Sequence, residues 1–580
     1  MTINSSRLTI AGLALLILLG AFLRLHHLGE PTVTHVEMYV PGICLPHGIS
    51  YPEERLTLVR VLTSTLNSDT HPPAFYMLMW AWTKCFGTST WAMRLPAALL
   101  GTACIPLVFW LGSLTRQPAA GWIAAALVAV NGHLVFWSRI ARMFTLACCL
   151  GLLATILLLK IAQHPRASTT LKFLYAAIML LGLCTHIFFW LILAAHMLWT
   201  LASAWSRQQP LPGAARLEFL VLILGSLLLA SSAYQNGNTL AALSSNVLVY
   251  AREYLQFGFI FPLMGYSSGV YPARGPILLI DDPHLSAWRW LFFLLSAALF
   301  VIGALSVRAS EDKLLAETAV PSWKAWLSAA VLAALAILCF VYVARTYAAP
   351  PNPTLRTAER MIVLPFLLAV AAIIIQRSWN SFVAPLSTGV TRFLTGDQAL
   401  VLILVVVPFA ALAFVSLFKP IFNARGLILV SPYLLLVLAA GIVRLARYPI
   451  LAAVVLLVVA IAHYSGLQAY NHVSAGRADY KAIAAELTPQ LESTDLVFLT
   501  PEFFSTPLFY YMPSDWNHIV GRNYDAASRN NPQARIWAIW FYNYEPEPRE
   551  PIEEALSNYH AVRTVEAPGV QASLYVPNSL

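Results

Sequence analysis

Long apolar runs separated by short polar steps dominate this chain of 580 residues. A transmembrane helix needs roughly 20 mostly apolar residues in succession, and about 13 stretches meet that criterion. They are 8–28, 94–113, 118–137, 141–160, 171–189, 190–206, 215–233, 288–306, 323–344, 360–376, 397–418, 425–444 and 448–466. The pattern predicts a multi-spanning α-helical membrane protein.

One apolar segment, PPAFYMLMWAWTKCF at 72–86, differs from the predicted spans. It is short and rich in Trp, Tyr, Phe and Met, which is typical of a helix lying in the membrane interface. When this segment is left out and the N-terminus is placed inside, Lys and Arg gather in the cytoplasmic loops, as the positive-inside rule expects. Four segments then lie outside: 29–93, 234–287, the linker around 345–360, and 467–580.

The last of these segments is different in kind, because charged and polar residues occur throughout it. Strand-like runs occupy 495–500, 534–542 and 572–576, and a helix-like run at 480–487 precedes them. The sequence therefore predicts a transmembrane domain over 1–466. It predicts a small soluble α/β domain over 467–580, on the outer (extracytoplasmic) face.

Composition agrees with the hydrophobic pattern. The chain is 59% hydrophobic and 11% charged, with a mean hydropathy of +0.68, far from the values of soluble proteins. The formal net charge of +9 does not indicate nucleic-acid binding, because Lys and Arg are scattered and form no basic block. A cytoplasmic (inner) membrane location, in contact with membrane lipids, is expected.

Arginines on the predicted outer side need a separate explanation, because the positive-inside rule disfavours them. Arginine clusters suit bidentate capture of phosphate oxygens, and a lipid phosphate or diphosphate is the anion found at that depth. The alternative is that these side chains snorkel to headgroups or cap helix ends. The candidates for binding a donor phosphate are Arg139, Arg142, Arg356, Arg360 and Arg425.

Acidic residues are few in the first outer segment, and two of them stand where a polar step meets an apolar or aromatic helix: Glu37 in THVEMY and Asp69 in SDTHPPAFY. A partly desolvated carboxylate is a better proton acceptor near neutral pH. For Asp69, a helix N-cap is an equal alternative. Glu37 shows no capping pattern by this interpretation, so the sequence favours a catalytic role for it.

Histidines near the same surface include His35, His71 and His186. A lone histidine is more often structural than a ligand. Their spacing matches no zinc motif, so a divalent metal held with Glu37 or Asp69 stays an open alternative. The sequence has no glycine-rich phosphate loop, dinucleotide fingerprint or nucleophile elbow, which argues against a nucleotide-sugar or ATP site.

Eight segments carry a recognisable order and spacing. They are FLRLHHLGEPTVTHVEMY (22–39), SDTHPPAFYMLMWAW (68–82), AMRLPAALLGTACIPLVFWLG (92–112), HLVFWSRIARMFTLACCLGLLA (133–154), LGLCTHIFFWLILAA (181–195), FNARGLILVSPYLLLVLAAG (422–441), RADYKAIAAEL (477–487) and TDLVFLTP (494–501). In order and spacing they resemble bacterial GT-C glycosyltransferases. The relevant branch includes protein O-mannosyltransferases, the lipid A aminoarabinose transferase and related lipopolysaccharide sugar transferases.

The resemblance implies transfer of a sugar from a polyprenyl-phosphate donor to a hydroxyl of a lipid, glycan or protein acceptor, usually with inversion. An acid in the first outer loop acts as base, and outer arginines stabilise the leaving phosphate. Glu37 matches the second acid of the family's Asp-Glu pair, and Asp69 the acid before His-Pro-Pro. Arg142 and Arg425 match family arginines, and Arg139 lies near the family's acid position. His186 matches the family's Thr-His, and His71 and Tyr39 are expected in the same pocket.

This chain departs from the family pattern at two positions, because Val36 and Ile140 stand where relatives have acids. One interpretation is that Glu37 takes over as base together with Asp69. An alternative is an inactive relative that binds a lipid-linked glycan or scaffolds a partner. A polytopic transporter is a third alternative, which would predict internal repeats and ionisable residues at mid-membrane.

Overall fold

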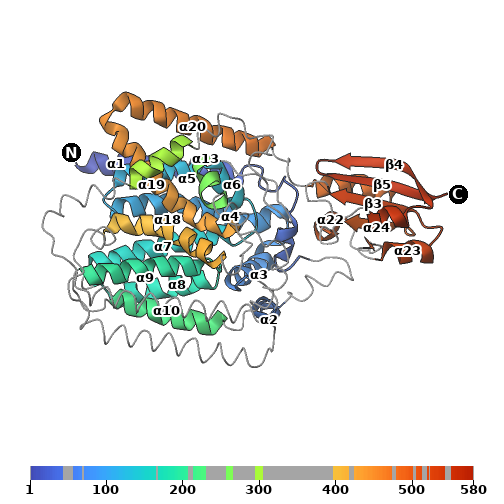
Figure 1. Ribbon diagram of the computed structural model, residues 1–580, viewed down its shortest axis with the longest axis horizontal. Coiled ribbons are helices and arrows are strands. Elements are labelled where there is room, and N and C mark those ends of the chain that lie inside the picture. The colour runs from blue at the N-terminus through green and yellow to red at the C-terminus, as the bar shows by residue number, and fades with distance from the viewer. Residues whose placement is uncertain are drawn as a thin grey trace.

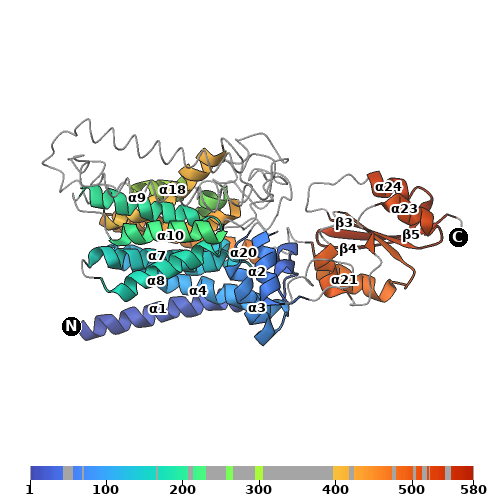
Figure 2. The same cartoon turned by 90° about the horizontal axis from the view of Figure 1, so that it is seen from below.

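A computed structural model gives the fold of the chain. A bundle of long helices forms its main body, and a small β-sheet unit lies beyond one end of the bundle (Figure 1). The N-terminal end of α1 lies at the opposite end of the bundle in both views (Figure 2). The residues described are 2–43, 57–67, 71–164, 167–206, 213–229, 256–265, 294–304, 396–416, 424–472, 478–500, 505–512, 519–520, 523–541 and 550–578.

The bundle helices fall on the predicted spans. They are α1 (Thr2–Leu25), α4 (Thr90–Leu114), α5 (Pro118–Val130), α6 (Gly132–Ser138), α7 (Phe144–Gln163), α8 (Thr169–Leu183), α9 (Phe189–Ser206), α10 (Gly213–Leu229), α18 (Asp397–Ser416), α19 (Ser431–Arg444) and α20 (Pro449–His472). The predicted span 288–306 contains the helix Leu294–Ala304. The predicted spans 323–344 and 360–376 lie outside the described residues.

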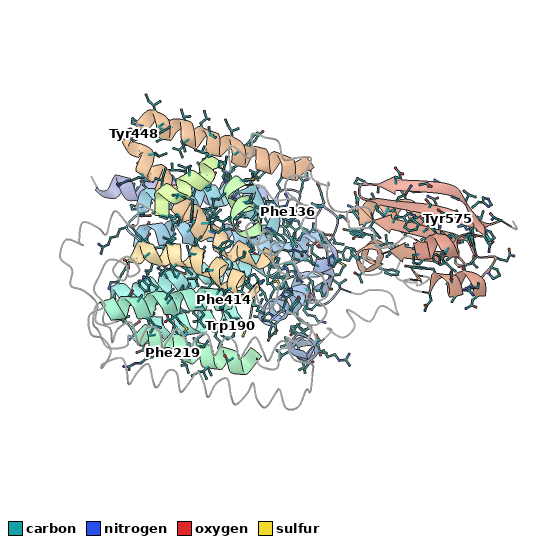
Figure 3. The ribbon with its side chains drawn as sticks, viewed as in Figure 1. Phe136, Trp190, Phe219, Phe414, Tyr448 and Tyr575 are labelled. Carbon is teal, nitrogen blue, oxygen red and sulfur yellow. The ribbon has the colours of Figure 1, made fainter. Side chains whose placement is uncertain are left out.

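Length, hydropathy and exposed surface make the chain a multi-pass helical membrane protein. Four of the described helices are long and apolar enough to cross a membrane, and the bent pair of α5 and α6 adds a fifth candidate. On the outside of the bundle, Tyr448 is 54% and Phe414 40% exposed (Figure 3), and Ile450 on α20 is 81% exposed. Soluble monomers rarely expose large apolar faces, so these faces contact lipid.

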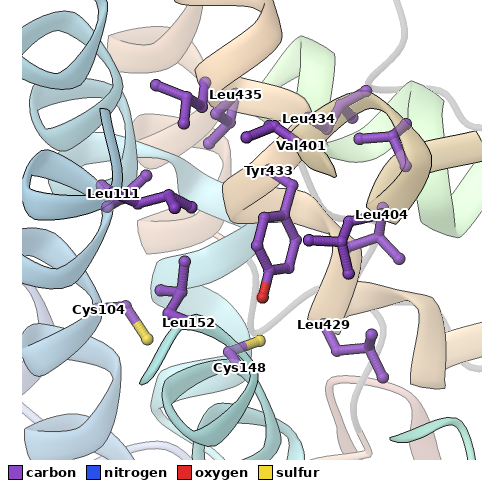
Figure 4. Close-up of a cluster of buried hydrophobic side chains, with 14 of the residues drawn as sticks. Cys104, Leu111, Cys148, Leu152, Val401, Leu404, Leu429, Tyr433, Leu434 and Leu435 are labelled. Carbon is purple, nitrogen blue, oxygen red and sulfur yellow. The ribbon is translucent and has the colours of Figure 1, made fainter. Parts of the chain in front are cut away.

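The interior of the bundle is closely packed. Figure 4 shows the ring of Tyr433, from α19, among Leu404 of α18 and Leu152 and Cys148 of α7. The Tyr433 hydroxyl lies 3.0 Å from the Thr155 hydroxyl, so this buried polar group has a partner within the core.

A break between α5 and α6 bends the chain by 56° within one predicted span. Asn131 caps α6 by accepting from the Leu134 N–H at 3.1 Å. The break leaves the last carbonyls of α5 without helical partners, and Arg24 of α1 donates to the Val128 and Ala129 carbonyls at 2.9 and 3.0 Å. The guanidinium is fully buried, so it fastens α1 to the broken end of α5.

The predicted second outer loop is described only in part, over 256–265. It holds the π-helical turn η4 (Gln256–Ile260) and α13 (Phe261–Met264). The Pro262 carbonyl accepts from the Asn131 amide at 2.8 Å. This part of the loop therefore packs into the α5–α6 break and is not an exposed loop.

The first outer segment contains a short 3₁₀-helix and two short α-helices: η1 (His35–Tyr39), α2 (Leu58–Asn67) and α3 (Ala74–Phe86). Helix α3 begins after Pro73 and ends at Phe86, and the Gly87 that follows has a φ of 76°, which favours glycine. With 13 residues it is too short to cross a membrane, in agreement with its exclusion from the predicted spans.

The C-terminal unit is a five-stranded mixed sheet of order β2-β1-β3-β5-β4. Its strands are β1 (Leu496–Thr500), β2 (Ile519–Val520), β3 (Ile536–Phe541), β4 (Tyr559–Ala567) and β5 (Val570–Pro577), and its helices are α21 (Tyr480–Leu487), α22 (Ser505–Tyr511), α23 (Tyr524–Asn530) and α24 (Glu550–Ala555). Strand β3 is buried along its whole length because helices cover both faces. Strands β1, β3 and β5 lie where the sequence predicts strands.

Helix α22 joins the sheet unit to the first outer segment. The Tyr511 hydroxyl accepts from the Val33 N–H at 2.9 Å, and the Tyr510 hydroxyl donates to the Thr88 carbonyl at 2.8 Å. Val33 and Leu508 share one buried cluster with side chains of α3 and α21. The two units are thus in direct contact. The predicted domain boundary at 466/467 falls inside α20, which continues to His472.

Candidate functional site

Glu37 is fully buried at the centre of a hydrogen-bond network. Its Oε1 atom accepts from Arg94 Nε at 2.8 Å and from the Ala141 N–H at 3.0 Å. Its Oε2 atom accepts from Arg94 Nη2 at 2.9 Å, and from the Thr34 N–H at 2.9 Å and hydroxyl at 3.2 Å. Five donors therefore surround one carboxylate.

The local sequence explains part of this arrangement. Thr34 precedes η1 and Glu37 is its third residue, so the Glu37 side chain reaches back to the Thr34 N–H as in a capping box. The expectation that Glu37 shows no capping pattern is wrong, because Thr-x-x-Glu is that pattern. A carboxylate that a guanidinium and backbone N–H groups hold in its ionised form is a poor proton acceptor, so the geometry does not support the predicted base role of Glu37.

Arg94, the partner of Glu37, was not among the residues predicted for the site. Besides its two bonds to Glu37, Arg94 donates to the carbonyls of Leu28, Pro31 and Thr32 at 2.9–3.0 Å, so all five guanidinium N–H groups are used. It is fully buried in the first turns of α4. A signal existed, since Arg94 begins the predicted span 94–113 and is a cation at its outer end.

Arg142 lies beside this network, in the turn that Glu37 fastens through the Ala141 N–H. Its Nη1 atom donates to the Val36 carbonyl at 3.3 Å and to the Tyr76 hydroxyl at 3.1 Å. Its guanidinium carbon lies 5.7 Å from the Tyr39 ring centroid. Val36 thus offers its backbone oxygen to a cation.

Two imidazoles lie within the positive field of Arg142. Burial lowers the pKa of His35 to about 3, with smaller contributions from the positive charges of Arg425 and Arg142. Burial also lowers the pKa of His186 to about 3, with a smaller contribution from the positive charge of Arg142. Both rings are therefore neutral at physiological pH. We call His35, Arg142, His186 and Arg425 the arginine–histidine cluster.

His71 and Tyr39 border this cluster: the Tyr39 ring lies against Arg142, and the His71 ring lies beside His186. The His71 and His186 ring centroids are 6.0 Å apart. Arg139 belongs to the same turn as Arg142 but faces another element, because its Nη2 atom donates to the His27 carbonyl at 2.9 Å after the end of α1. Asp69, Arg356 and Arg360 lie outside the described residues.

Within the described part of the chain, no three His, Cys, Asp or Glu side chains gather closely enough to hold a metal ion. The chemistry of the described cluster is that of an anion site, because cations and neutral N–H donors line it.

Comparison with known proteins gives structural similarities only. No protein-family model matches the chain, and no curated protein matches it. Among solved structures, the chain is similar to ArnT from Cupriavidus metallidurans in the apo state, with 14% identity, a TM-score of 0.39 and 98% of each chain covered. It is similar to archaeal oligosaccharyltransferase AglB from Archaeoglobus fulgidus, solved with an inhibitory peptide and a dolichol-phosphate. That match has 11% identity and a TM-score of 0.45, and covers 99% of this chain and 74% of AglB.

A structure of ArnT bound to undecaprenyl phosphate also matches, with 12% identity, a TM-score of 0.40 and 98% of each chain covered. TM-scores below 0.5 at such identities decide no function for this chain.

Proposed function

We propose that this chain is a membrane glycosyltransferase. It transfers a sugar from a polyprenyl-phosphate donor to an acceptor hydroxyl on the outer face of the cytoplasmic membrane, with inversion at the anomeric carbon. The observation that carries the proposal is the arginine–histidine cluster, in which Arg142 and His186 are buried and His35 and Arg425 half-buried. Its two guanidinium groups beside neutral imidazoles suit a phosphate group.

The donor phosphate binds at Arg142 and Arg425. Arg142 is well placed for this role, because the Val36 carbonyl, the Tyr76 hydroxyl and the Tyr39 ring fix its guanidinium before any ligand arrives. When the anomeric C–O bond breaks, its electron pair passes to the phosphate oxygen, and the cations stabilise that charge. Arg356 and Arg360 are proposed to add phosphate contacts on the basis of their sequence positions, whereas the predicted phosphate contact of Arg139 is not carried into this proposal because Arg139 donates to the His27 carbonyl.

Asp69 is the proposed proton acceptor. It is the remaining acid of the predicted pair, since Glu37 is occupied by Arg94 and backbone N–H groups. It precedes His71 by two residues, and the His71 ring lies beside His186 in the cluster. As the acceptor oxygen bonds to the anomeric carbon, its proton passes to the Asp69 carboxylate.

Glycan analysis of a deletion strain tests the proposal. We expect one envelope glycan, lipid or protein to lose a sugar, and the matching polyprenyl-phosphate sugar to accumulate. The wild-type gene should restore the sugar, Asp69→Asn should not, and the exposed-site control Glu30→Gln should restore it fully. Envelope glycans identical to the parent strain would refute the proposal.

A second candidate is a protein that binds a lipid-linked glycan without transferring it, and Val36 in place of an acid favours it. For that protein, Asp69→Asn would complement the deletion as well as the wild type does. Undecaprenyl phosphate would still bind to the purified protein.

A further inference from the structure

The side chain of His186 is tightly packed among its described neighbours. It lies between α8 and α9 and is fully buried. The ring centroids of Phe144 and Phe188 lie 5.6 and 5.5 Å from its own. The backbone of Gly426 lies so close that a Cβ atom there would come within 2.5 Å of His186 Cε1. The ring therefore cannot turn freely, and Gly426 is needed for it to fit.

The hydrogen bonds of His186 define which ring nitrogen carries the proton. Nδ1 accepts from the Phe188 N–H at 3.0 Å, so Nδ1 has no proton of its own. A neutral ring must then carry its proton on Nε2. Burial and the nearby Arg142 lower the pKa of His186 to about 3, which keeps the ring neutral between about pH 5 and 8.

The Nε2–H group is buried, and none of the described residues offers it a hydrogen-bond acceptor. Most buried donors in folded proteins are paired, and leaving one unpaired costs free energy. An acceptor that arrives with a ligand would remove this cost. Since Arg142 lies close enough to affect the ring, the ligand group that suits the position carries negative charge.

We infer that the His186 Nε2–H donates a hydrogen bond to an oxygen of the donor phosphate, between the guanidinium groups of Arg142 and Arg425. This inference rests on the proposed function and names a residue of its phosphate site. A neutral donor adds a directed hydrogen bond without adding charge, and the bond strengthens as the leaving oxygen gains charge.

Asparagine at 186 separates this role from a structural one. Its Oδ1 atom takes the place of Nδ1 and can accept from the Phe188 N–H, but it has no donor at the position of Nε2. Glutamine makes the complementary change, because its longer side chain carries an N–H group toward the Nε2 position. His196→Gln is the matched control: His196 is an equally buried histidine whose two nitrogens contact Thr155 and Tyr175.

The experiment measures binding of undecaprenyl phosphate to the purified full-length protein in nanodiscs, with undecaprenol and inorganic phosphate as separate probes. We expect His186→Asn to weaken undecaprenyl phosphate binding roughly tenfold at an unchanged melting temperature, the size expected for one hydrogen bond to a charged group. His186→Gln should restore most of the affinity. His196→Gln should lower the melting temperature and leave the affinity unchanged.

Each other result is decisive. If the wild type binds undecaprenyl phosphate no better than undecaprenol, both this inference and the proposed function are wrong. If the wild type binds it and His186→Asn binds equally well, only this inference is wrong. Inorganic phosphate binding as tightly as the lipid would assign the site to free phosphate, which would also overturn the inference.

Discussion

Replacing Glu37 with glutamine distinguishes a structural anchor from a catalytic base. In the wild type, Arg94 directs two N–H groups at the carboxylate and the Ala141 N–H directs a third. Glutamine presents an NH₂ group where one oxygen was, so donors face donors, and the buried Arg94 charge loses its counterion. Breaking a buried ion pair by removing one partner costs about 3–5 kcal/mol.

The free energy of unfolding of Glu37→Gln should therefore fall by about 3–5 kcal/mol. Denaturant titration of the purified protein in detergent measures it, with sugar transfer followed in parallel. We expect the loss of transfer to follow the loss of folded protein. The matched control is Glu30→Gln, since the Glu30 side chain is 68% exposed and its ion pair with His27 contributes little.

A base at position 37 would behave differently. Glu37→Gln would then unfold at the same denaturant concentration as the wild type, while the turnover number fell by orders of magnitude and the affinity for the donor was kept. That result would show that the ion pair is not the main role of Glu37. Arg94→Met provides a second test, because only the anchor model expects it to be as damaging to stability as Glu37→Gln.

Three further predictions concern other parts of the molecule. Tyr511→Phe leaves the Val33 N–H without its acceptor and should loosen the sheet unit by about 1 kcal/mol, measured as faster proteolysis between the two units. The pKa of His186 is about 6.5 in the unfolded chain and about 3 in the folded chain, so the free energy of unfolding should rise with pH between these values. Melting temperatures measured at several pH values would show this rise, and it should be less steep in His186→Asn. One carboxyl oxygen of Glu218 accepts from two hydroxyls, and the described residues offer the other oxygen no partner. In denaturant titration, the free energy of unfolding of Glu218→Gln should therefore stay within about 1 kcal/mol of the wild type, whereas that of Glu218→Leu should fall by about 2–3 kcal/mol.

The helices and strands could be predicted from local patterns, because a membrane span and a buried strand each depend on consecutive residues. The helix α21 begins and ends at the predicted residues 480 and 487. The break at Asn131 was missed because the span criterion counts apolar residues over about 20 positions, and the stretch 118–137 stays mostly apolar although Asn131, Gly132 and His133 interrupt it. Its stabilising contacts come from Arg24 and Pro262, each more than 100 positions away.

The site was harder to predict because its chemistry depends on pairs that are distant in sequence. The sequence suggests a carboxylate at Glu37 but not Arg94, 57 residues later, which occupies it. Arg139 and Arg142 lie in one turn and cannot be told apart by sequence, yet their side chains contact different elements. The neutral state of His186 depends on the Phe188 N–H and on the Arg142 charge, and neither effect can be inferred from spacing.

The contacts of Glu37 also constrain the order in which the chain assembles during synthesis. Its partners Arg94 and Ala141 follow it by 57 and 104 residues, so Glu37 emerges from the ribosome well before either of them. In the predicted topology, the Glu37 carboxylate is then exposed to water on the outer side and well solvated until Arg94 and Ala141 are in place. The outer segment can close only after α4 has been inserted and the turn before α7 has formed. Mutations that delay insertion of α4 would thus leave the first outer segment open to proteases, although they lie far from it in the sequence.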